Sequence, residues 1–135
     1  MTSQIATLVG ATLVGLVSAL VLHELGHALA AGLFGGRIER MQWRGLGARV
    51  IADLPGRRAQ VAFLLAGAGA NALAAGLTCA LAIGAGSSTM MAAMALVSGI
   101  QSLHAALSLV PSGTNDGARL LAMWRERNQP SQGER

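Results

Sequence analysis

The sequence has few charged and few aromatic residues, and each deficit excludes a class of protein. Only 12% of the 135 residues are charged, whereas a soluble domain carries about a quarter. A surface so poor in charge suits lipid better than water. Aromatic residues make up 3% of the chain, so nucleic acid bases would have no set of rings on which to stack, despite the net charge of +4. The single cysteine, Cys79, excludes an intrachain disulfide.

Long apolar segments dominate the chain instead. Hydrophobic residues make up 53% of it, and its mean hydropathy is +0.52. A membrane-spanning helix needs about 20 apolar residues, and three segments meet this requirement, at about 5–34, 59–83 and 90–110. The first segment lacks the basic start of a signal peptide. We predict an all-α membrane protein with three transmembrane helices in a single domain, residues 1–127, followed by a disordered tail, 128–135.

The positions of the basic residues predict how the chain is oriented in the membrane. All ten are arginines: six lie between the first two apolar segments and four follow the third. Because cytoplasmic loops are enriched in basic residues, we expect the N-terminus outside, the first loop inside and the C-terminus in the cytoplasm. The absence of lysine favours a GC-rich bacterial genome, so we expect an integral protein of the bacterial inner (cell) membrane.

Residues 37–53 separate the first two apolar segments and do not have the composition of a membrane-spanning segment. Apolar residues such as Ile38, Met41 and Trp43 alternate with charged ones, and Gly45 and Gly47 lie in the middle. This pattern predicts a small β-hairpin on the cytoplasmic side, with Trp43 at the depth of the lipid headgroups. A disordered basic loop is the alternative.

The first apolar segment ends in the sequence HELGH, which fits the H-E-x-x-H pattern. On a helix, His23 and His27 lie on one face and can reach one metal ion. Glu24 lies beside them and can take a proton from metal-bound water. A chance match is the alternative, but ionisable groups in a membrane helix are costly and usually functional. We therefore predict a zinc site on His23 and His27, with Glu24 as the catalytic base.

A catalytic zinc ion needs a third protein ligand, and Asp116 is the best candidate. It follows the third apolar segment, on the same predicted side of the membrane as HELGH, although an ordinary turn aspartate would look the same. Asp53 and Glu39 lie in a basic loop, where pairing with arginine is the simpler expectation. His104 would lie about 18 Å from Asp116 along a straight helix. His104 therefore stays open as a ligand or as a structural hydrogen-bonding residue.

These motifs, in this order on three spans, resemble the site-2 protease family of intramembrane zinc metalloproteases, most closely its small bacterial members. HELGHALAAGLFGGRIER resembles the first core helix of that family. Gly67 and Asn71 resemble its Gly-x-x-x-Asn element. Pro111 with Asp116-Gly117 resembles its Asn-x-x-Pro-(x)4-Asp-Gly motif, although Ser108 stands where the family usually has asparagine. The resemblance covers residues 10 to 120, almost the whole chain.

The resemblance implies a function and a set of site residues. The metal ligands would be His23, His27 and Asp116, the ion would be Zn²⁺, and Asn71 would bind substrate. The expected activity is hydrolysis of peptide bonds within or near the transmembrane segments of membrane protein or peptide substrates. The expected partners are substrate and the lipid bilayer, with no nucleic acid. Two alternatives stay open: a catalytically silent zinc-binding membrane scaffold, and a small metal transporter with polar residues spread along its spans.

Overall fold

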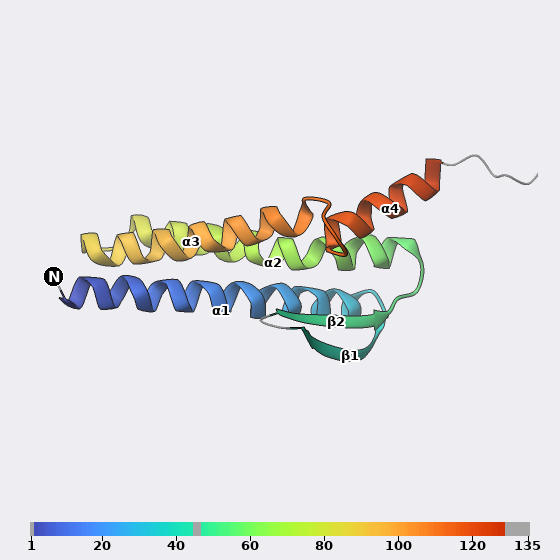
Figure 1. Ribbon diagram of the computed structural model, residues 1–135, viewed down its shortest axis with the longest axis horizontal. Helices are drawn as coiled ribbons and strands as arrows, with labels where there is room; N and C mark the ends of the chain where they lie inside the picture. The colour runs from blue at the N-terminus through green and yellow to red at the C-terminus, as the bar shows by residue number, and fades with distance from the viewer. Residues whose placement is uncertain (1, 45–46, 129–135) are drawn as a thin grey trace, which may run out of the picture.

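The computed structural model describes residues 2–44 and 47–128 of the chain. Within these ranges the order of elements is α1 (Thr2–Leu33), β1 (Arg37–Arg44), β2 (Gly47–Asp53), α2 (Arg57–Ile83), α3 (Ser88–Leu109) and α4 (Asp116–Asn128). Figure 1 shows α1, α2 and α3 running alongside one another, with the hairpin and α4 at one end of this bundle. The N-terminus lies at the opposite end.

Helices α1, α2 and α3 are each long and apolar enough to cross a membrane. Small residues let them approach closely: a Cβ on Gly15 would lie 2.8 Å from the side chain of Ile100 in α3. Such contacts hold membrane helices together, because lipid provides no hydrophobic force between them. The three helices confirm the prediction of three apolar spans, and their bounds lie close to those expected.

The outer surface of the bundle is apolar. In the most apolar part of α1 only 11% of residues are buried, and large side chains such as Val17, Leu73 and Leu77 are 63%, 76% and 62% exposed. An exposed apolar surface of this extent would be unstable in water, so it marks a face for lipid. The protein is a membrane protein.

The predicted hairpin is present as a two-stranded antiparallel sheet in which Met41 lies opposite Val50. The register shifts between Ile38 and Arg40, which leaves Glu39 as the extra residue of a bulge. Val50 is only 2% exposed and packs in a core that includes Ala31 and Phe63. This packing fixes the hairpin against α1. Trp43 is 71% exposed, and its depth in the membrane stays a prediction.

Helix α4 was not predicted from the sequence. Asn115 starts it by accepting a hydrogen bond from the backbone N–H of Ala118 at 2.9 Å, and its amide donates to the Val110 carbonyl at the end of α3, at 2.7 Å. One side chain thus ends one helix and begins the next. The predicted tail began at residue 128, but Asn128 is the last residue of α4. The remainder, 129–135, lies outside the described residues.

Candidate metal site

His23 and His27 lie on the inward face of α1, one helical turn apart. They are 6% and 4% exposed, and their Nε2 atoms are 3.1 Å apart. Residues four apart in the sequence lie on the same side of a helix, so this spacing brings the two rings together. Both rings therefore present a nitrogen to the same point.

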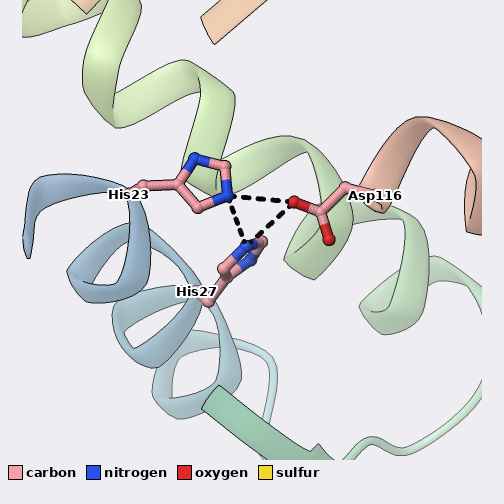
Figure 2. Close-up of side chains that lie close together, drawn as sticks. All are labelled: His23, His27 and Asp116. Carbon is pink, nitrogen blue, oxygen red and sulfur yellow. Dashed lines mark hydrogen bonds and ion pairs between the residues drawn. The ribbon is translucent and has the colours of Figure 1, made fainter. Parts of the chain in front are cut away.

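Asp116, the first residue of α4, completes the group. Its Oδ2 atom lies 3.1 Å from the Nε2 atom of each histidine, and Figure 2 shows the three side chains converging on a common point. Among the described residues, these three form the group that could hold a metal ion. The two imidazoles come from α1, and the carboxylate comes from the start of α4, almost ninety residues later in the sequence. The short connection from α3 to α4 brings Asp116 to the histidines.

The protonation states of these groups suit a cation. The Nδ1 atom of His27 lies 2.7 Å from the carbonyl oxygen of Phe63, and a carbonyl only accepts, so Nδ1 must carry the hydrogen. In neutral His27 the lone pair is then on Nε2, facing the Asp116 oxygen. Two acceptors at 3.1 Å repel each other unless a proton or a metal ion lies between them. The donor set therefore fits a metal ion.

Asp116 is ionised in this arrangement. Burial alone would raise the pKa of its carboxyl, but the hydrogen bonds and charges of His23 and His27 outweigh burial and hold the pKa well below its usual range. The carboxylate therefore offers lone pairs to a cation, as a metal ligand must.

Gly67 of α2 forms the back of the site. A Cβ at this position would lie 2.7 Å from the His27 Nε2 atom and 2.7 Å from the His23 Cε1 atom. Real Cβ atoms essentially never approach so closely, so only glycine leaves the imidazoles where they are. The small residue is thus required by the position of the two rings, and not by backbone flexibility.

Glu24 lies next to the three-residue group but is not part of it. Its Oε2 atom accepts a hydrogen bond of 2.7 Å from the backbone N–H of Val50 in β2. The hairpin thereby fixes the carboxylate, which is 7% exposed. Glu24 therefore lies beside the three-residue group, with its carboxylate at the same cavity.

A cavity of about 550 Å³ opens onto the site. It is bounded by α1, by β2 from Gly47 to Val50, by α3 at His104 and Ser108, and by the start of α4. Arg49 and Arg119 lie at this cavity. Burial and the charge of Arg49 both lower the pKa of Arg119, while Asp116 raises it. The three converging side chains thus lie at the wall of a cavity.

The other predicted residues are not part of this three-residue group. Asn71 is completely buried, and it does not line the cavity. Its substrate-binding role stays a prediction. Glu39 lies in the β1 bulge, and Asp53 lines a separate hollow beside α4. His104 lines the cavity with its ring 5.1 Å from that of His23, so the long separation from Asp116 expected for a straight helix is wrong, because α3 ends at Leu109. Its nitrogens are nevertheless not part of the three-residue group.

Three features of the site were missed in the sequence. Gly67 was noted only as part of an element shared with a family, and its contact with both imidazoles had no signal of its own. The Phe63 carbonyl and the Val50 amide are backbone groups, so any residue type could supply them. Only the path of the chain shows that they support His27 and Glu24.

The architecture is that of a membrane protein with three apolar helices and a polar group of side chains at one end. Among solved structures, the chain is similar to the site-2 protease from Methanocaldococcus jannaschii, with a TM-score of 0.70 and 19% sequence identity. The match covers 90% of this chain and 56% of that one, so the chain spans little more than half the length of that protease. No family model and no curated protein matches the sequence. The likeness shows that the chain has an intramembrane-protease-like fold.

Proposed function

We propose that this protein is an intramembrane zinc metalloprotease that hydrolyses peptide bonds within or near transmembrane segments of membrane protein or peptide substrates. The observation that carries this proposal is the convergence of His23, His27 and Asp116 within 3.1 Å of one another. A carboxylate, Glu24, lies at the same cavity. The likeness to a site-2 protease supports the proposal.

Zinc suits this site because it binds two imidazoles and a carboxylate while keeping a fourth position open. Ligand atoms about 2.0–2.1 Å from a tetrahedral zinc ion lie roughly 3.3 Å apart, close to the 3.1 Å separations seen here. When bound, zinc would polarise the scissile carbonyl and make a water molecule more acidic.

The chain's own residues handle the protons and hold the ligands. Glu24 takes the proton of the attacking water and later gives a proton to the leaving amine. The Phe63 carbonyl fixes the tautomer and orientation of His27, in the way that outer partners of metal-binding histidines do. The Val50 amide holds Glu24 in place. The hairpin therefore contributes to the reaction by orientation, and not by binding the metal.

Removing individual ligands tests the metal site. His23→Ala or His27→Ala should remove zinc from the purified protein, because two remaining ligands cannot hold it tightly. Asp116→Ala should weaken zinc binding, whereas His104→Ala should leave it unchanged. Zinc content by atomic emission and affinity by competition with a chelator measure these effects. Full zinc binding by Asp116→Ala, together with loss in His104→Ala, would show that the third ligand is His104.

The two alternatives predict different behaviour of the purified protein. A zinc-binding scaffold would bind a membrane partner without cleaving it, and a metal transporter would move zinc across a liposome membrane. The test incubates zinc-loaded protein with a panel of transmembrane peptides and analyses the products by mass spectrometry, alongside zinc flux in liposomes. Cleavage abolished by a chelator and restored by zinc is the expected result. Flux without cleavage would replace the protease proposal with transport.

We further propose that the N-terminus faces the outside of a bacterial inner membrane, with the hairpin and the C-terminus in the cytoplasm. The arginines of the hairpin lie at the same end of the bundle as HELGH and α4, and the link between α2 and α3 lies at the other end. Basic segments favour the cytoplasmic side.

Cysteine labelling tests this orientation. In a Cys79→Ala background, which removes the exposed native thiol, Ser87→Cys should react with an impermeant thiol reagent added to intact cells. Arg40→Cys should react only after the cells are opened. The reverse pattern would place the metal site at the outer face of the membrane.

A further inference from the structure

His104 is the third histidine at the cavity, and the metal group does not use it. It lies on α3, half-buried, with its ring centroid 5.1 Å from that of His23. Both side chains line the cavity. The position is thus adjacent to the proposed zinc ligands, while its nitrogens lie outside their group.

The ring of His104 makes no hydrogen bond with any residue that the structure describes. A polar, ionisable side chain on a membrane helix is costly and is seldom placed there without a use. A packing role alone would be served by leucine at lower cost. The free ring nitrogens, facing a cavity, point to an interaction with something that enters it.

The neighbouring polar residue on the same helix face cannot supply that interaction. Ser108, one turn after His104, directs its hydroxyl to the carbonyl oxygen of Ala105 at 2.9 Å, so its only hydrogen is used within the helix. Asn115, at the start of α4, uses its amide on the Leu107 and Val110 carbonyls. On the wall that α3 forms, the N–H of His104 is therefore the side-chain donor left for a bound molecule.

The proton acceptor and this donor approach the metal group from different elements. Glu24 belongs to α1, which packs against α3, but its carboxylate lies at the β2 wall of the cavity, where it accepts a hydrogen bond from Val50. His104 lies on the α3 wall, and β2 and α3 do not contact each other within the described residues. A peptide bond between them would have Glu24 on the side of the attacking water. Its carbonyl oxygen would be accessible from the α3 side.

We propose that an N–H of His104 donates a hydrogen bond to the carbonyl oxygen of the scissile peptide bond. The proposal rests on the protease function proposed above. As the water oxygen bonds to the carbonyl carbon, negative charge develops on the carbonyl oxygen. The C–N bond then breaks, and the amine leaves with the proton that Glu24 took from the water. His104 keeps its own proton throughout. Donors fixed where charge develops are among the largest contributors to catalysis.

The kinetic test compares His104→Ala with His104→Asn and with Leu103→Ala. Leu103 is the preceding residue, is 59% exposed and does not line the cavity, so its variant should behave like the wild type. His104→Ala should lower kcat about 10²–10³-fold, the effect of losing one such donor, with KM and zinc content little changed. His104→Asn, which keeps an N–H, should recover part of the loss.

A binding measurement separates this role from the protease function itself. A phosphinic pseudopeptide has tetrahedral oxygens that resemble the transition state, whereas the matching peptide amide does not. His104→Ala should weaken binding of the phosphinic compound by a factor similar to the fall in kcat, and it should leave the affinity for the peptide amide unchanged. Equal weakening of both, no weakening, or loss of zinc would overturn the proposal.

The possible failures remain distinguishable. Should zinc-loaded wild type cleave no peptide, the protease proposal fails. The hydrogen-bond proposal is then decided by the phosphinic compound alone, because its binding needs no turnover. Selective weakening by His104→Ala would support the donor role, and a compound that does not bind the wild type would overturn both.

Discussion

Replacing Gly67 by alanine should abolish zinc binding and, with it, proteolysis. The new Cβ would lie 2.7 Å from the His27 Nε2 atom and 2.8 Å from the His23 Nε2 atom, the two nitrogens that face the proposed ion. The neighbours that must move are rings held between helices, one of them by a hydrogen bond to the Phe63 carbonyl. One methyl group would therefore separate the ligands. Zinc content and the cleavage rate measure the result.

The chain offers a matched control on the same helix. Gly69 has no atom within 4 Å of an added Cβ, so Gly69→Ala should keep zinc and activity at wild-type levels. Alanine is favoured over glycine inside a helix by about 0.5–1 kcal/mol, so neither variant should lose helix content. Wild-type zinc affinity in Gly67→Ala would show that the rings have space to retreat, and that the close contact at Gly67 does not define the site.

The sequence predicted the elements whose signal is continuous along the chain. Three long apolar segments meet the length requirement of a membrane helix, and the alternation between residues 37 and 53 is typical of a hairpin. Both predictions were confirmed. Helix α4 was missed because its first residues read as a turn. Its start depends on Asn115 bonding to Val110 and Ala118 at once, a contact that no local pattern indicates.

The site shows the same division between local and non-local information. His23 and His27 share a helix face, so their spacing alone predicts that they meet. Asp116 was predicted from its side of the membrane and from a family resemblance, and the structure places it beside both histidines. The Val50 amide could not be predicted, because a backbone group has no sequence signature and its position depends on how the hairpin packs against α1.

Replacing Glu24 by glutamine should leave zinc bound and nearly eliminate cleavage. Glutamine has the same shape, and its carbonyl oxygen can still accept the hydrogen bond from Val50 that the glutamate accepts at 2.7 Å. It cannot take a proton from water. Because general acid–base catalysis contributes about 10²–10⁴-fold, the cleavage rate should fall by a factor in this range at unchanged zinc content.

Glu24→Ala distinguishes the chemical role of this residue from its structural one. Alanine removes the acceptor as well as the base, and it leaves the buried amide of Val50 without a partner, which costs about 1–3 kcal/mol. Glu24→Ala should therefore unfold at a lower temperature than Glu24→Gln, while both lose cleavage. Equal activity in Glu24→Gln and wild type would rule out the proposed base. A loss of activity that follows thermal stability across the two variants would instead assign Glu24 to holding the hairpin, and the proton acceptor would have to be sought among the other groups of the cavity.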